Sequence, residues 1–316
     1  MKTNRLYDPV LPWSELARVP KKRQLYEDDV HFREGLADLV DAAGENAVNV
    51  VHRLALLLIK PDGLAAGKAG VIVDFVAENG FDLVAYEAIE FGPHHWRDLW
   101  RYQLNTATLD RLAVNDIVLH GRAVCLLLRH PALATPATVR LSGLKGPSDV
   151  SQQTPGCLRR ILRQPNRVLS LLHVADEPAD LVRELTLLLD CRVRRTLWER
   201  AVTGATSSFE QLRHDIASSL HRPMEPGPAL DRVEASLRVA REGAARDQAL
   251  AALSEMRAGS KIDWRRFVRA LEVAGACCER WDLAVLGSTF IDYDRPDHAK
   301  SIGPGGSHYW EDHISG

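Results

Sequence analysis

The sequence has few of the features that mark secreted, metal-bound or membrane proteins. Its five cysteines are an odd number and contain no CxxC pair, so neither a disulfide framework nor a cysteine-held zinc site is expected. No apolar run approaches the roughly 20 residues of a transmembrane helix. Met1 to Arg5 are not followed by the apolar core of a signal peptide. We therefore expect a cytoplasmic protein without a membrane anchor.

The chain also lacks an excess of charge of either sign. Its 40 lysines and arginines nearly balance its 42 aspartates and glutamates, which gives a formal net charge of −2. Such a balance creates no overall field that would attract nucleic acid or an anionic membrane surface. We expect neither partner, and each local basic patch needs its own interpretation.

What the sequence does contain is an alternation of strand-like and helix-like patterns between about residues 53 and 195. The expected strands are 54–59, 82–91, 123–128 and 167–172. The expected helices are 70–79, 94–104, 108–114, 137–142, 156–162 and 178–195. This order predicts an α+β fold, a ferredoxin-like four-stranded antiparallel sheet with helices covering one face.

The rest of the chain predicts additions to this domain. Residues 1–50 combine prolines and a basic run with one amphipathic helix over 31–43, and are expected to form an arm that packs on a neighbour. The sheet domain is expected over 51–195. Residues 196–290 predict an α-helical domain, because apolar residues recur there at helical spacing. Residues 291–316 predict a tail that contains glycine, proline and histidine.

The most informative pattern is a pair of strand ends. Lys60-Pro61-Asp62-Gly63 ends the first strand, and His173 ends the fourth. A lysine and a histidine at adjacent strand ends can hold and transfer a phosphoryl group. Each feature alone has a simpler explanation, because such a turn is common and a histidine that ends an apolar run is more often structural.

Taken together and in order, the motifs resemble those of nucleoside diphosphate kinase. They span about residues 53–190 and comprise Leu58 to Gly63, Gly70 to Ile72, Gly80 to Val84, Leu141 to Gly143, Gly146 to Asp149, Thr154 to Arg159, and His173 with Asp176 and Glu184. The resemblance implies a phosphotransferase that passes the terminal phosphate of a nucleoside triphosphate to a diphosphate through a phosphohistidine. It also implies Mg²⁺ bound with the nucleotide, and a homo-oligomer.

The resemblance assigns four roles. His173 falls on the nucleophile, and Glu184 on the glutamate that fixes the histidine tautomer. Lys60 falls on the lysine that contacts the transferred phosphate. Arg159 falls on an arginine that binds nucleotide phosphates, for which a guanidinium fork is well suited.

Other positions depart from the family pattern. Ser170 replaces an asparagine that contacts the ribose, and Val174 and Ala175 replace a glycine and a serine after the histidine. Lys145 stands where the family usually has a phosphate-binding threonine. Arg140 is one position away from the family's second phosphate-binding arginine. These changes indicate altered sugar and base recognition more than altered phosphate handling.

An aromatic residue near the histidine cannot be assigned from the sequence alone, because Trp100 and Tyr102 both align with the family's tyrosine. For His173, Lys60, Arg159 and Glu184, a purely structural or solvated role remains open beside the catalytic one.

Three hypotheses of function follow, of which the third is a helical scaffold whose kinase-like domain binds nothing. The first is a phosphotransferase that uses a nucleoside triphosphate such as ATP, with a nucleotide or related small molecule as the acceptor. The alternative is a nucleotide-binding regulatory or scaffold protein that has lost kinase turnover, which the changes at Ser170, Val174 and Ala175 would favour.

The tail leaves further alternatives open. It holds seven acidic and histidine side chains that could ligate a metal, although their spacing matches no closed zinc or calcium site: Asp292, Asp294, Asp297, His298, His308, Asp312 and His313. Its glycines, prolines and aromatic residues indicate instead a segment that docks on a partner subunit or across the active-site mouth. A disordered tail is the third alternative.

Overall fold

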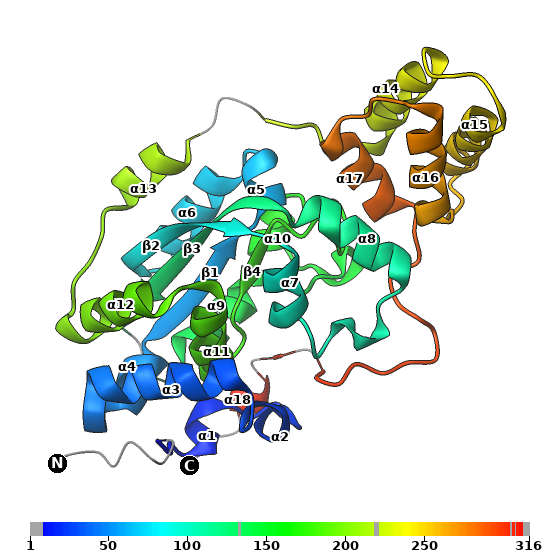
Figure 1. Cartoon of the computed structure of the whole chain (residues 1–316). Helices are drawn as coiled ribbons and strands as arrows, with labels where there is room; N and C mark the ends of the chain where they lie inside the picture. The colour runs from blue at the N-terminus through cyan, green and yellow to red at the C-terminus, as the bar shows by residue number, and fades with distance from the viewer. Residues whose placement is uncertain (1–8, 132–133, 218–220, 304, 307, 312–316) are drawn as a thin grey trace.

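The sheet is built around β1 (Leu54–Ile59), whose six residues are all apolar and buried. β1 pairs antiparallel with β3 (Gly121–Arg129) on one side and with β4 (Leu172–Val174) on the other. β2 (Asp82–Phe91) extends the sheet beyond β3, also antiparallel. The resulting order, β2-β3-β1-β4, is that of a ferredoxin-like sheet (Figure 1). The expected fold class is confirmed.

Helices fill the connections and both flanks of the sheet. The structure is a computed structural model that describes residues 9–131, 134–217, 221–303, 305–306 and 308–311. Through the last strand and its following helix, the helices are α1 (Trp13–Leu16), α2 (Lys22–Tyr26), α3 (Val30–Ala43), α4 (Ala47–His52), α5 (Pro61–Ala65), α6 (Ala69–Glu78), α7 (Pro93–Leu99), α8 (Leu109–Val118), α9 (Ala137–Lys145), α10 (Leu158–Ile161) and α11 (Pro178–Leu188). After them come α12 (Cys191–Thr203), α13 (Phe209–Ile216), α14 (Pro226–Arg238), α15 (Ala244–Arg257), α16 (Trp264–Ala274), α17 (Arg280–Thr289) and α18 (His308–Glu311). Short 3-10 helices are η1 (Gly44–Asn46), η2 (Leu104–Thr106) and η3 (Val150–Gln152).

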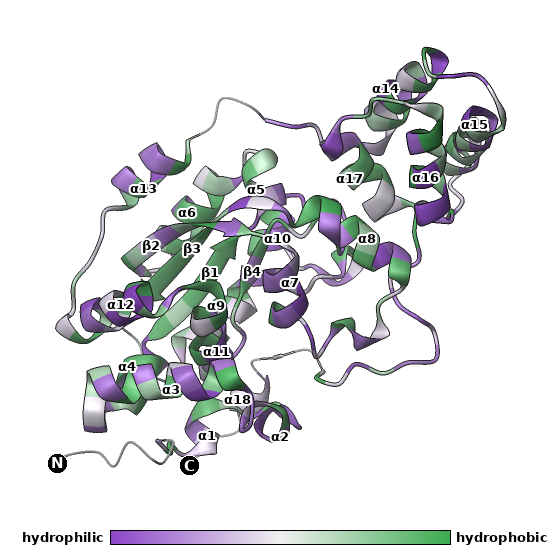
Figure 2. Ribbon diagram, in the orientation of Figure 1, coloured by the Kyte–Doolittle hydropathy of each residue, from purple (hydrophilic) through white to green (hydrophobic). Residues whose placement is uncertain are grey.

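The helices cover both faces of the sheet, so the expectation that they cover one face is wrong. Leu54, Leu56 and Leu58 of β1 enter one apolar cluster together with α3, α7 and α11. The alternate residues of β1 enter a second cluster with α6, α9 and α13. Because β1 is apolar on both faces, each face needs a cover. Figure 2 shows β1 and β3 in the colour of hydrophobic residues.

The fourth strand differs from the expected strand 167–172. His173 lies in the middle of the three-residue β4, opposite Leu58 of β1, instead of at the end of a long strand. Asn166 accepts hydrogen bonds from two backbone N–H groups that follow it, both at 3.0 Å. Leu171 has a φ of 66°. An asparagine turn followed by a left-handed residue interrupts an extended strand.

The helix expected from Pro178 to about Arg195 is two helices. α11 ends at Leu188, and α12 begins at Cys191 and continues to Thr203. Asp190 separates them, because its side chain accepts hydrogen bonds from the first backbone N–H groups of α12 and so starts a new helix.

The chain leaves the sheet domain and then returns to it. Helices α14 to α17 pack on one another, and α17 and α16 contact α8 (Figure 1). Beyond α17, the backbone N–H of Thr108 donates to Tyr293 (3.1 Å), and the N–H of Ile302 donates to Tyr102 (3.1 Å). The described part of residues 291–311, here called the C-terminal segment, therefore docks on its own chain.

The five cysteines all lie in the described residues and are free. Burial raises the pKa of the Cys125 thiol, which keeps it in its unreactive protonated form. None of the helices in the described ranges has the length and apolar character needed to cross a membrane.

The end of β1 and the chain before β4 are held together through Leu171, which places Lys60 near the strand that carries His173. The backbone N–H of Lys60 donates to the carbonyl of Leu171 at 3.1 Å, and Asp62 Oδ2 accepts from the N–H of Leu171 at 2.9 Å. A Cβ at Gly63 would lie 2.2 Å from the Leu171 carbonyl oxygen. This contact explains why the turn ends in glycine, and the two hydrogen bonds hold Leu171 in its left-handed conformation.

We expect Gly63→Ala to lower the free energy of unfolding by about 2 to 4 kcal/mol, because the added methyl group forces the two backbones apart. Gly70→Ala is the matched control, since nothing lies within 4 Å of a Cβ at that helical position, and it should be neutral or stabilising by up to about 1 kcal/mol. Urea unfolding monitored by circular dichroism measures both. Equal stability of the two variants would contradict the close contact at Gly63.

Candidate active site

A cavity of about 640 Å³ opens beside β4, and His173 lines it. Its walls come from segments far apart in the sequence: the end of β1, the α7 to α8 region, α9 and the loop after it, the residues before β4, and the C-terminal segment. Lys60, Lys145, Arg159 and Ser170 line the same cavity. The volume suits a ligand of nucleotide size.

The contacts of His173 assign its tautomer. Trp100 Nε1 donates to His173 Nδ1 at 3.3 Å, and an indole N–H can only donate, so Nδ1 carries a lone pair. In the neutral ring the proton is therefore on Nε2, which lies 2.8 Å from Glu184 Oε2 and donates to it. Nδ1 therefore keeps a lone pair, which the Trp100 N–H covers in this structure.

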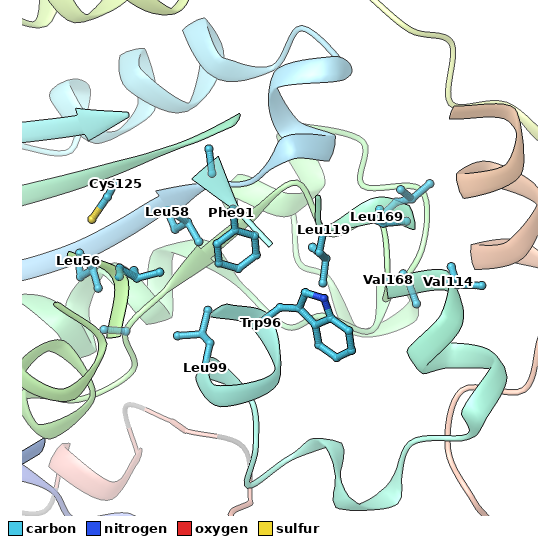
Figure 3. Packing of buried hydrophobic residues seen from close by; sticks show 14 of the residues in the cluster. Leu56, Leu58, Phe91, Trp96, Leu99, Val114, Leu119, Cys125, Val168 and Leu169 are labelled. Carbon is cyan, nitrogen blue, oxygen red and sulfur yellow. The ribbon is translucent and has the colours of Figure 1, made fainter. Parts of the chain in front are cut away.

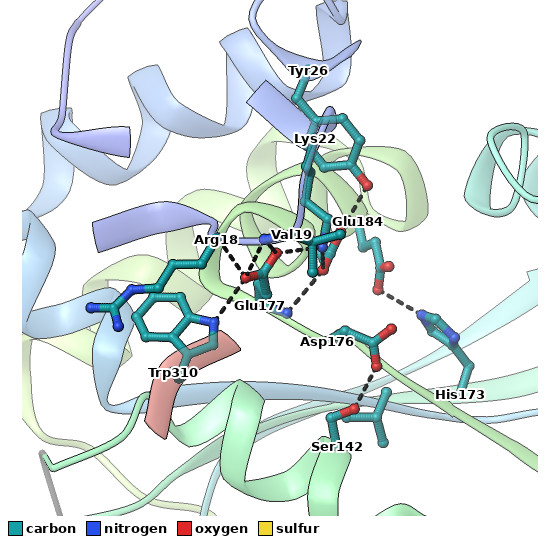
Figure 4. Close-up of polar contacts among 12 residues, drawn as sticks. Arg18, Val19, Lys22, Tyr26, Ser142, His173, Asp176, Glu177, Glu184 and Trp310 are labelled. Atoms are coloured by element: carbon teal, nitrogen blue, oxygen red, sulfur yellow. Dashed lines mark hydrogen bonds and ion pairs between the residues drawn. The ribbon is translucent and has the colours of Figure 1, made fainter. Parts of the chain in front are cut away.

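Glu184 comes from α11 and is almost completely buried. Burial raises the pKa of this carboxyl group, an effect that the adjacent His173 opposes. A more basic carboxylate strengthens the hydrogen bond to Nε2–H and would stabilise an imidazolium ring. Figure 4 shows Glu184 reaching from its helix to the His173 ring.

The aromatic neighbour of His173 is Trp100, not Tyr102. The Trp100 and His173 rings meet edge to face, with centroids 5.5 Å apart. Trp100 follows directly on α7, which is anchored by the burial of Trp96 and Leu99 in the cluster that also holds Leu58 of β1 (Figure 3). The Tyr102 hydroxyl instead donates to the carbonyl of Leu25.

Three cations near His173 differ in how completely they are paired. Lys60 Nζ lies 3.3 Å from Asp62, and Lys145 Nζ lies 2.9 Å from Asp176. Arg159 donates to the carbonyl of Gly146 at 2.9 Å, and no carboxylate of the described residues forms an ion pair with it. Burial lowers the pKa of Lys60 and of Lys145, and lowers that of Arg159 to about 10. Such desolvated cations favour an anionic ligand.

Arg140 is not brought to the cavity. It is exposed on α9, whereas Ser142, Gly143 and Lys145 of the same helix line the cavity. One residue turns a helical side chain by about 100°, so a displacement of one position from the family's arginine changes the face. Ser170 does line the cavity, directly before the left-handed Leu171.

Val174 and Ala175, the two residues after His173, contribute to the structure through their backbone groups. Ala175 is fully buried, and its backbone N–H donates to Leu56 of β1. The carbonyl of Val174 accepts from Lys145 Nζ at 3.4 Å. Hydroxyl groups at the cavity come instead from Ser142, Ser148 and Ser170.

The C-terminal segment forms part of the wall of this cavity. Lys300, Gly303, Gly305, Gly306 and His308 are among the lining residues. The chain passes so close to Asp176 that a Cβ at Gly305 would lie 2.7 Å from the Asp176 Cβ. The described part of the tail thus docks on its own chain and lines the cavity.

The metal alternative for the tail receives no support from the described residues, where no group of three or more His, Cys, Asp or Glu side chains could hold a metal ion. Asp294 instead pairs with Arg111. Asp312 and His313 lie outside the described residues.

Both ends of the described chain meet at Glu177, which precedes α11. The backbone N–H of Arg18 donates to Glu177 Oε1 at 2.7 Å, and Trp310 Nε1 donates to the same oxygen at 2.8 Å. Lys22 Nζ lies 2.7 Å from Glu177 Oε2 and 2.7 Å from Asp180. Figure 4 shows this group beside the Asp176 and His173 contacts. The N-terminal arm therefore packs on its own chain.

Comparison with known proteins bears on this arrangement. The family model of nucleoside diphosphate kinase matches residues 41–192. These residues form a nucleoside-diphosphate-kinase-like domain. The match contains β1 to β4, His173 and Glu184, and the resemblance seen in the sequence motifs is confirmed for this part of the chain.

Several solved structures resemble the kinase-like domain. The nucleoside diphosphate kinase of Aquifex aeolicus is 19% identical, with a TM-score of 0.38, over 44% of this chain and 96% of that chain. An NDP kinase from Pyrobaculum aerophilum is 17% identical, with a TM-score of 0.37, over 44% and 97%. The enzyme of Halobacterium salinarum, solved in complex with CDP, is 19% identical, with a TM-score of 0.36, over 44% and 88%. No curated protein matches the sequence.

Sequence patterns missed part of the cavity. Arg111, Arg167 and Lys300 line it without belonging to any recognised motif. The sequence indicates Asp294 only as a candidate metal ligand. The signals that could have found them are weak, because each is a single charged residue in a segment that reaches the cavity only in the folded chain.

The ionised carboxylate of Asp176 contributes to the stability of the kinase-like domain. Although burial opposes the shift, Lys145 and Lys22 hold the pKa of Asp176 well below its usual range. A depressed pKa gives stability that is complete above the unfolded pKa of about 3.9 and is lost as the pH falls toward the folded value. We expect Asp176→Asn to cost about 2 kcal/mol at pH 7 and clearly less at pH 3.

Urea unfolding at the two pH values measures this difference. Asp82→Asn, at an exposed position that begins β2, is the control and should change the free energy of unfolding by less than about 0.5 kcal/mol. A cost for Asp176→Asn that is the same at pH 3 and pH 7 would contradict the ionised role of Asp176.

Proposed function

We propose that the kinase-like domain transfers the terminal phosphate of a nucleoside triphosphate such as ATP through phospho-His173 to a nucleotide or related acceptor. The observation that carries the proposal is the geometry of His173. Glu184 holds its Nε2–H, Nδ1 keeps a lone pair, and His173 lines a cavity together with the cations Lys60, Lys145 and Arg159. Two carboxylates, Asp62 and Asp176, pair with these three cations, so one positive charge remains.

The proposed reaction has two displacements. The lone pair of His173 Nδ1 attacks the terminal phosphorus, a P–N bond forms, and the bond to the bridging oxygen breaks so that the nucleoside diphosphate leaves. The Nε2 proton stays on the ring, and Glu184 stabilises the resulting positive charge. In the second displacement an acceptor oxygen attacks the phosphorus and the P–N bond breaks. Lys60 and Arg159 stabilise the charge on the transferring group.

A magnesium ion fits this cavity only together with the nucleotide. The carboxylates that line it are Asp149 and Asp176, and Asp176 is already engaged by Lys145 and Ser142. Mg²⁺ commonly binds through one or two carboxylates and substrate phosphates, so Asp149 is the residue that would help to hold it. When bound, the ion would neutralise phosphate charge.

Incubation of the full chain with ATP labelled on its terminal phosphate should give an acid-labile protein adduct. His173→Ala should abolish the adduct, and Glu184→Gln should slow its formation by about 10- to 100-fold, because the imidazole loses its charged partner. His214→Ala, at an exposed histidine of α13, is the matched control and should label normally. An unlabelled wild type, or equal labelling of His173→Ala, would refute the proposal.

A second candidate is a nucleotide-binding regulatory protein without turnover. The observation that favours it is the Trp100 N–H bonded to Nδ1, the nitrogen that would have to attack. Stabilisation of the chain by ATP in a thermal-shift measurement, without a phosphohistidine, would support this function. Rapid phosphate exchange between ATP and a second nucleoside diphosphate would exclude it.

The enzymatic proposal makes Trp100 a shield that has to leave Nδ1 before transfer. Trp100→Phe removes the N–H donor and keeps an aromatic ring, so at saturating ATP we expect labelling to become about 3- to 10-fold faster. Trp281→Phe, in α17 and outside the cavity, is the control. Labelling by Trp100→Phe at or below the wild-type rate would show that Trp100 positions His173 instead of shielding it.

A further inference from the structure

The cavity contains a second group of basic side chains that the proposed phosphate transfer does not use. Arg111, Arg167 and Lys300 line it, in addition to Lys60, Lys145 and Arg159. We call these three residues the outer cationic group. They come from α8, from the loop before β4 and from the C-terminal segment, so only the complete fold brings them together.

Asp294 is the carboxylate on which the outer cationic group converges. Arg111 Nη1 forms an ion pair with Asp294 Oδ1, and Arg167 Nη2 lies 3.6 Å from Asp294 Oδ2. Burial lowers the pKa of Lys300, and Asp294 opposes this shift. Asp149 also lines the cavity, and its Oδ1 accepts hydrogen bonds from the backbone N–H and the hydroxyl of Ser151. Three cations against two carboxylates leave an excess of one positive charge.

The outer cationic group pairs with a different carboxylate from the cations beside His173: Asp294 binds Arg111 and Arg167, whereas Asp62 and Asp176 bind Lys60 and Lys145. Burial lowers the pKa of Arg111, with Asp294 opposing and Arg167 contributing. Lys60 responds in the same way to Asp62 and to Arg159. The cavity therefore offers two centres of positive charge, of which one is beside the nucleophile.

An unused donor belongs to the outer centre. Arg111 Nε is buried and has no hydrogen-bond partner among the described atoms, and Arg111 lines the cavity. A buried N–H without a partner costs free energy that a ligand oxygen would recover. A guanidinium also binds phosphate or carboxylate oxygens through paired hydrogen bonds.

We propose that the outer cationic group is a second anion subsite, and that the preferred ligand is a nucleotide that carries a further phosphate on its sugar in addition to its 5′-phosphates. This inference rests on the proposed function for the orientation of the ligand, whose 5′-phosphates lie at His173. The changed ribose-contact position Ser170, also at the cavity, is consistent with a sugar that is recognised by its charge.

Binding of two matched ligands to the full chain tests the subsite. Isothermal titration calorimetry compares adenosine 5′-diphosphate with adenosine 5′-diphosphate 3′-phosphate in the presence of magnesium. The wild type should bind the second at least about tenfold more tightly, because one more charge-assisted contact is formed. Arg167→Gln and Lys300→Gln should each reduce this preference to less than about threefold, while the affinity for adenosine 5′-diphosphate stays within about threefold of the wild type.

Arg195→Gln is the control, since Arg195 is exposed on α12 and does not line the cavity. It should keep the full preference. Equal affinity of the wild type for the two ligands would overturn the subsite, and so would a preference that survives in both Arg167→Gln and Lys300→Gln. Melting temperatures of the two variants within about 3 °C of the wild type would show that they remain folded.

Failure of the second anion subsite can be distinguished from failure of the proposed function. If the wild type binds adenosine 5′-diphosphate 3′-phosphate more tightly than adenosine 5′-diphosphate but forms no phosphohistidine, the subsite stands and the transferase proposal fails. If it forms phospho-His173 but does not distinguish the two ligands, the transferase proposal stands and the subsite fails.

Discussion

The structure depends on the contact between two backbone turns, one at the end of β1 and one before β4. Leu171 is a bulky residue in a left-handed conformation, which the chain does not favour without support. The Lys60 N–H, the Asp62 carboxylate and the absent side chain of Gly63 together provide that support. The same contact sets Lys60 against the chain that leads into the strand of His173, so the restraint on the backbone and the geometry of the cavity have one origin.

A second constraint comes from α11. This helix presents Glu184 to the histidine, and its first turn is tied to both the N-terminal arm and the C-terminal segment through Glu177 and Asp180. Lys22 is buried between these carboxylates, which hold its pKa above its usual value despite burial. Removing one member of such a group would leave another charge buried and unpaired. The added segments therefore support the helix that orients His173.

Much of the sheet domain could be predicted from the sequence, because its signals are local. The six apolar residues of β1 and the ordered motifs up to Glu184 lie in short stretches whose pattern reflects their own structure. The choice between Trp100 and Tyr102 could not be made, since both are aromatic residues just beyond α7. Arg111 and Asp294 are 183 positions apart in the sequence. No local sequence pattern therefore predicts the contact between them. The sequence does not predict the positive φ of Leu171 either, because a leucine in an apolar run normally indicates an extended strand.

The route of the C-terminal segment also has a consequence for the order of assembly. The four strands and α11 are complete by Leu188, so the kinase-like domain can begin to fold while the helical region is still being synthesised. Lys300 is added 127 positions after His173, which corresponds to about 6 to 25 s of translation. During that interval His173 and the cations beside it exist without the part of the cavity wall that the C-terminal segment supplies. A nascent chain therefore exposes this histidine to solvent before its cavity is complete.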